Sequence, residues 1–79
     1  MKKEYTIAGG QSRKDSESWN GESFGSHDPI TFETFQEADV EFDSASFHAK
    51  TKCPAYDYVV ISCEDLDTGL SDRVKTVDL

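Results

Sequence analysis

The sequence predicts an α+β domain in which one α-helix packs across a small antiparallel sheet, in the order β-loop-β-α-β-β. Residues 3–8 and 29–33 alternate apolar and polar residues, which is typical of half-buried strands. After them, apolar residues recur at spacings of three and four, the period of an amphipathic helix. The chain has 79 residues, of which 35% are hydrophobic. This is enough for one thin core, so we expect a single domain over residues 1–79.

The first strand is expected at residues 3–8, where Tyr5 and Ile7 alternate with polar side chains. We expect it to end at Gly9-Gly10. Residues 11–28 are rich in Ser, Gly, Asp and Glu and have no clean period. They predict a long polar loop, with room for a short edge strand at residues 22–24.

A second strand is expected at residues 29–33, where Ile30 and Phe32 point to the same side. A helix should follow, because Thr34-Phe35-Gln36-Glu37 fits a capping box, in which the side chains of the first and last residues reach each other's backbone. Pro54 should stop this helix. Its buried stripe is expected to contain Phe35, Ala38, Phe42, Ala45 and Ala49.

Residues 56–63 form the strongest strand pattern, because they are apolar on both faces and rich in β-branched and aromatic side chains. We expect this strand at the centre of the sheet. Residues 65–69, which end in Gly69, predict a turn. The polar residues 70–79 then predict a strand at the edge.

Neither a metal site nor a cofactor is expected. Cys53 and Cys63 are separated by nine residues and form no Cys-x-x-Cys motif. Together with His27 and His48 they match no compact zinc motif. We therefore expect free thiols, with Cys63 acting as a small buried residue of the central strand.

Charge is distributed unevenly along the chain. There are 16 acidic and 8 basic residues, a net charge of -8, and nine acids with no base between Lys14 and Lys50. Direct nucleic-acid binding is not expected, because it requires clustered Lys and Arg. No run of 18 apolar residues and no secretory leader is apparent. We expect a cytoplasmic protein with no membrane partner.

Four acids border the buried stripe of the expected helix. Glu37 with Glu41, and Asp39 with Asp43, are like-charge pairs at i,i+4, each costing about 0.2 to 0.5 kcal/mol in an isolated helix. The helix dipole favours acids in the first turn. The dipole accounts for Glu37 and in part for Asp39. It does not account for Glu41 and Asp43.

Val40 and Phe47 lie outside this stripe and form an apolar patch among the acids. Two interpretations remain open. Either Trp19 or Phe24 from the loop folds over the patch, or Phe47 anchors a protein partner while carboxylates steer a basic surface towards it. The candidate partner-binding residues are Glu33, Glu37, Asp39, Val40, Glu41, Asp43 and Phe47.

No catalytic motif is convincing. Asp67-Thr68-Gly69 matches the aspartic-protease triplet, but the chain is too short for two lobes, and a hairpin turn explains the glycine. The same segment resembles part of a calcium loop, whose twelfth position would fall on Thr76 instead of an acid. The Gly-x-Ser-x-Gly spacing occurs at Gly21-Glu22-Ser23-Phe24-Gly25, but it lies in the expected polar loop and not at the strand-to-helix turn of a nucleophile elbow. No glycine-rich phosphate loop occurs. We therefore predict a protein without enzymatic activity.

About half of the chain resembles a strand-helix-hairpin unit that is common in small phage and mobile-element proteins. The resemblance covers residues 30–38, the helix that follows, residues 56–61 and the turn at Asp67-Thr68-Gly69. In layout and acidic composition the chain resembles some anti-CRISPR proteins. These are small, non-enzymatic domains that bind a CRISPR effector and block its DNA-binding channel, the acidic ones sometimes by imitating the charge of DNA. The resemblance implies an inhibitor, in the host cytoplasm if phage-encoded, that occupies a basic surface of a larger complex.

Two alternatives remain. One is a regulatory module that binds through the apolar patch of Val40 and Phe47, with charge serving only solubility. The other is a homodimeric protein that pairs through its last strand, residues 70–79.

Overall fold

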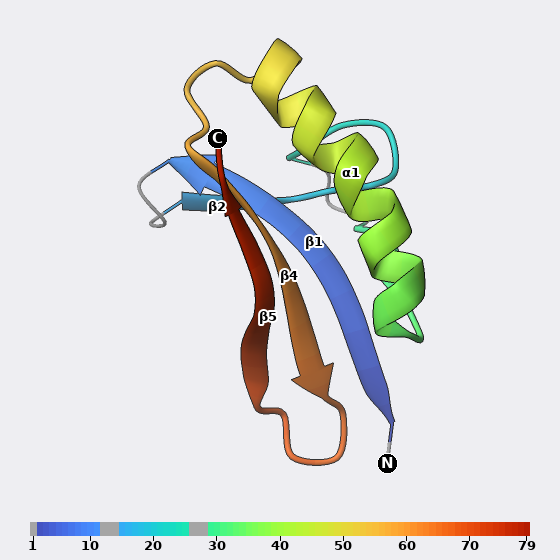
Figure 1. The fold of residues 1–79 in the computed structure, drawn as a ribbon. Helices are drawn as coiled ribbons and strands as arrows, with labels where there is room; N and C mark the ends of the chain where they lie inside the picture. Colours follow the sequence, from blue (N-terminus) through green and yellow to red (C-terminus); the bar gives the residue numbers. More distant parts are fainter. Residues whose placement is uncertain (1, 12–14, 26–28) are drawn as a thin grey trace.

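The computed structural model of the chain describes residues 2–11, 15–25 and 29–79. A helix lies across one face of a five-stranded antiparallel sheet (Figure 1), which confirms the predicted α+β class. The two central strands are β1 and β4, and β5 lies on the outer side of β4. On the other side of β1, two short strands, β2 and β3, pair with different parts of it. The elements are β1 (Lys3–Gln11), β2 (Asp15–Ser18), β3 (Thr31–Phe32), α1 (Phe35–Lys52), β4 (Tyr58–Asp65) and β5 (Ser71–Asp78).

Strand β1 does not end at Gly9-Gly10 as the sequence suggested, but continues to Gln11. A Cβ atom on Gly9 would lie 3.1 Å from Phe24 Cε1 and 3.1 Å from Tyr56 Cδ2. The missing side chain thus allows two aromatic rings to pack directly on the strand backbone. Their contact extends the buried length of β1 beyond its alternating segment.

Strand β2 lies within the segment that was expected to be a long polar loop. It pairs with the second half of β1, where Ser18 lies opposite Ala8. Beyond it, Trp19 and Phe24 form a single antiparallel bridge that closes a turn with Gly21 at φ +98°. Part of the expected loop, residues 12–14 and 26–28, lies outside the described residues.

Helix α1 begins at the predicted N-cap, but only half of the capping box forms as predicted, because the Glu37 carboxylate binds the Thr34 hydroxyl instead of the Thr34 backbone N–H. The Thr34 hydroxyl accepts a hydrogen bond from the Glu37 backbone N–H at 3.2 Å and donates one to the Glu37 carboxylate at 2.9 Å. The helix ends at Lys52, two residues before Pro54. Cys53 caps it with a backbone hydrogen bond to the Ala49 carbonyl.

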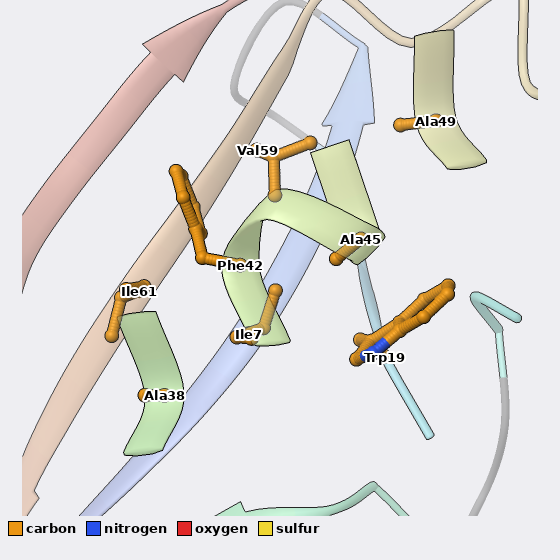
Figure 2. Close-up of a cluster of buried hydrophobic side chains, with 8 residues drawn as sticks. All are labelled: Ile7, Trp19, Ala38, Phe42, Ala45, Ala49, Val59 and Ile61. Atoms are coloured by element: carbon orange, nitrogen blue, oxygen red, sulfur yellow. The ribbon is translucent and has the colours of Figure 1, made fainter. Parts of the chain in front are cut away.

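The core lies between α1 and the sheet. Figure 2 shows Phe42 of the helix beside Val59 and Ile61 of β4, with Ile7 of β1 on the same sheet face. Three of the four buried helix residues are alanines, which let the helix lie close to the strands; the four are Ala38, Phe42, Ala45 and Ala49. This is the predicted stripe without Phe35, which lies at the rim against Tyr5.

Strand β4 is central, as predicted, and its residues Tyr58, Val59, Val60 and Ile61 are all buried. Strand β5 is an exposed edge. The intervening turn uses Gly69 at φ +77°, a conformation that favours glycine. A register shift between Ile61 and Ser62 leaves Val74 of β5 without a direct partner on β4.

Candidate functional site

The two apolar residues of the predicted site lie on the side of α1 that faces away from the sheet. Val40 is 76% exposed and Phe47 is 70% exposed. At about 100° per residue, both lie nearly opposite the buried stripe of the helix. Neither Trp19 nor Phe24 folds over them, because these rings pack towards the core instead. Of the two interpretations of this patch, the one in which the loop covers it is therefore wrong.

Glu41 contacts the protein's own tryptophan. The Trp19 indole N–H donates a hydrogen bond to Glu41 Oε1 at 3.0 Å. Trp19 is only 3% exposed, and a buried indole N–H requires an acceptor. The acid at position 41 therefore fastens the turn that contains Trp19 to the helix.

Asp39 joins α1 to the edge strand. Its carboxylate forms an ion pair with Lys75 of β5, and both side chains are about 40% exposed. The same ammonium group lies 5.0 Å from the centroid of the Phe42 ring. Lys75 is therefore held by a carboxylate and an aromatic face of the same helix.

With Glu37 in the capping box, three of the four helix acids have partners within the fold. The fourth, Asp43, is exposed, as is Glu33 just before the helix. Across residues 2–11, 15–25 and 29–79, neither of these two carboxylates forms a hydrogen bond or ion pair. We call the exposed set the α1 outer surface; it consists of Glu33, Glu37, Val40, Asp43 and Phe47.

A groove of about 480 Å³ runs along this surface. Asp43 and Phe47 of the helix form one side, and Trp19 and Gly21 of the turn form the other. Lys52 lies at the end where the helix finishes. The groove therefore has an acidic end and a basic end, and between them the helix contributes Ser44, Phe47, His48 and Thr51.

An aromatic cluster fixes the turn that forms the second wall. The centroid of the Trp19 ring lies 4.9 Å from Phe24 and 5.2 Å from His48, and Phe24 lies 5.2 Å from Tyr56. The sequence analysis missed this role of Trp19. A single large aromatic residue in a polar segment was the available signal, but nothing in the pattern identified its partners.

The Cys53 thiol is not activated as a thiolate. Burial, with a contribution from the Glu17 carboxylate, raises the pKa of the Cys53 thiol, which makes it less nucleophilic at neutral pH. A hydrogen bond between the Tyr5 and Cys63 side chains raises the pKa of the Tyr5 hydroxyl. Partial burial raises this pKa further. Among the described residues, no group of three or more His, Cys, Asp and Glu side chains could hold a metal ion.

Comparison with family models, curated proteins and solved structures gives no match. Within the described part of the chain, no helix has the length and apolar character needed to span a membrane. A functional proposal therefore has to start from the exposed groups of the α1 outer surface.

Proposed function

We propose that this chain is a non-enzymatic, acidic binding protein that inhibits a larger protein or nucleoprotein complex by occupying a basic, nucleic-acid-binding surface. An anti-CRISPR protein is the most concrete version. The observation that supports the proposal best is the exposure of Val40 and Phe47 on the outer side of α1, beside the Asp43 carboxylate, which has no ion pair or hydrogen bond with the residues that the structure describes.

The physical basis is the combination of an apolar anchor with surrounding charge. A large exposed aromatic side chain gains free energy when a partner covers it, and such residues contribute much of the binding energy of interfaces. Carboxylates around the anchor and a net charge of -8 attract a basic surface and speed association. Nucleic acid would be repelled, so we infer a protein partner.

The inhibitory effect follows from competition. A protein surface that binds a phosphate backbone is rich in Lys and Arg, whose neutralisation supplies much of its affinity for nucleic acid. A protein bound to that surface would exclude the nucleic acid.

The test has two steps. Capture from host lysates first shows which CRISPR effector complexes bind the protein. A gel-shift assay with these purified complexes then measures whether the protein inhibits their binding to target DNA. Phe47→Ser and Asp43→Lys should each lose capture and inhibition. The matched controls are Leu70→Ser, because Leu70 is also 70% exposed, and Asp72→Lys, because this residue of β5 is also exposed. Both controls should behave as the wild type does.

Equal capture by all variants would place the interaction elsewhere. Capture without any effect on nucleic-acid binding would contradict inhibition. Circular dichroism of each variant must first match that of the wild type. Asp39 and Glu41 are left unchanged, because they hold the fold together.

One observation favours a second candidate, a regulatory module that binds mainly through the apolar patch. Three helix acids have partners within the fold, so fewer carboxylates are available for charge attraction than the sequence suggested. This candidate predicts that affinity changes little with salt. Charge-driven binding predicts a marked loss between about 50 and about 300 mM NaCl.

A further inference from the structure

We propose that the groove beside Phe47 receives an arginine side chain of the protein partner, which stacks on the Phe47 ring and pairs with the Asp43 carboxylate. This inference rests on the proposed function and specifies the partner's chemistry at the same surface.

The two groups that would hold the arginine lie one helical turn apart. Asp43 and Phe47 are at i and i+4, so their side chains are neighbours on the helix surface. Both line the groove, and both are exposed. Because no group in the described ranges pairs with Asp43, its charge is free to bind a cation.

The same helix already holds a cation with the same pair of groups. Lys75 is paired with Asp39 and lies 5.0 Å from the Phe42 ring. Asp43 and Phe47 are four residues apart instead of three, and they offer a carboxylate and an exposed aromatic ring on the outer side of α1. Among the described residues, none forms an ion pair with Asp43 or a cation–π contact with Phe47, so we assign the matching cation to a partner.

The shape of the groove favours arginine over lysine. A guanidinium group is planar, so it can stack on a ring while its N–H donors pair with a carboxylate. An ammonium group can also contact a carboxylate and a ring together, as Lys75 does, but it is a compact point charge that is more strongly hydrated, so it loses more hydration on an apolar surface. The exposed surface of the groove is mostly apolar, although Ser44, His48 and Thr51 also line it, and such a surface suits the weakly hydrated guanidinium.

The charges along the groove also set a direction. Lys52 lies nine residues after Asp43, about 13 Å further along the helix axis. A second partner cation is therefore disfavoured at the Lys52 end. The arginine belongs at the end near Asp43.

The opposite wall is already in place. Trp19 is held by its hydrogen bond to Glu41 at 3.0 Å and by its contact with His48 at 5.2 Å. A groove that is formed before binding loses less conformational entropy when it is filled.

The test is an NMR titration of the ¹⁵N-labelled protein with blocked Gly-Arg-Gly, Gly-Lys-Gly and Gly-citrulline-Gly peptides. We expect saturable shifts of the residue 43–48 amides and of the Trp19 indole N–H with the arginine peptide. Citrulline keeps the planar shape without the charge, and lysine keeps the charge without the plane. Both should bind about two- to fivefold more weakly or worse.

Asp43→Asn and Phe47→Leu should each weaken the arginine peptide by a similar factor, and Asp72→Asn should leave it unchanged. Equal shifts with all three peptides, no saturable shift, or an equal loss in Asp72→Asn would overturn the inference. The two proposals can fail separately. If capture of a partner depends on Phe47 while the peptides do not differ, the function stands and the arginine site fails; if the arginine peptide binds while no partner is captured, the function fails.

Discussion

The hydrogen bond between Trp19 and Glu41 holds the turn against the helix. Glu41→Ala would leave a nearly buried indole N–H without its charged acceptor. We expect the free energy of unfolding to fall by about 1 to 2 kcal/mol, as measured by urea denaturation. The indole N–H resonance of Trp19 should shift at the same time.

Glu41→Gln serves as the control, because the amide oxygen can still accept the hydrogen bond. Glu41→Gln should keep more than half of the free energy of unfolding that Glu41→Ala loses. An unchanged denaturation midpoint and an unchanged Trp19 resonance in Glu41→Ala would show that this hydrogen bond contributes nothing.

Tyr56 should make the protein less stable in alkaline solution. Burial raises the pKa of its hydroxyl, and a hydrogen bond to Glu17 and the charge of that carboxylate raise it further. The unfolded chain then ionises first, at about pH 10. The contribution of the Tyr56 hydroxyl to the free energy of unfolding is complete below about pH 10. This contribution is lost as the pH rises through the higher pKa of the folded state.

Urea denaturation at about pH 9 and about pH 11 tests this expectation. Stability should fall less in Tyr56→Phe than in the wild type, and Glu17→Gln should give an intermediate fall. Identical pH dependence of wild type and Tyr56→Phe would contradict the assigned role of the hydroxyl.

At the level of elements, those defined by local patterns could be predicted from the sequence. The capping box at Thr34, the helical spacing of the alanines and the apolar run of β4 each act over a few residues. Strand β2 and the extension of β1 through Gly9 could not be predicted in this way. The extension of β1 accompanies the packing of aromatic rings from distant positions, Phe24 and Tyr56, on the Gly9 backbone, and β2 pairs with this extended part of β1.

In the candidate site too, features set by local patterns could be predicted, and features set by long-range contacts could not. Helical periodicity placed Val40 and Phe47 outside the buried stripe, but the sequence left open whether the loop covers them, and the structure shows that both are exposed. The roles of Asp39 and Glu41 depend on Lys75 and Trp19, which come from β5 and from the turn after β2. Such long-range pairs leave no periodic signal, so these acids could not be separated from Asp43.

The capping box should contribute measurably to helix stability. Thr34→Ala removes both the acceptor for the Glu37 backbone N–H and the donor to its carboxylate. We expect a loss of about 1 kcal/mol in the free energy of unfolding by urea denaturation. Thr34→Ser should stay close to the wild type, and an equal loss in Thr34→Ser would point to the methyl group instead of the hydroxyl.

At the level of the whole molecule, the edge of β5 favours a monomer. Arg73 and Lys75 lie on this strand, and the register shift at Val74 interrupts its regular pairing. Charged side chains and bulges are the features by which sheet edges avoid pairing with another copy. Sedimentation velocity should show a single monomeric species at micromolar concentration; a dimer that Val74→Lys abolished would support the homodimeric alternative instead.

The net charge of -8 should make salt act in opposite directions on folding and on binding. Repulsion among the acids opposes the compact state, and added salt screens it. The Asp39–Lys75 pair is partly exposed and contributes little, so its screening should not reverse this effect. The melting temperature should therefore rise between about 20 and about 300 mM NaCl, while affinity for a basic partner should fall over the same range.

A melting temperature that fell with salt would mean that internal ion pairs outweigh the repulsion. An affinity independent of salt would favour the apolar module, because contacts of Val40 and Phe47 are not screened by ions.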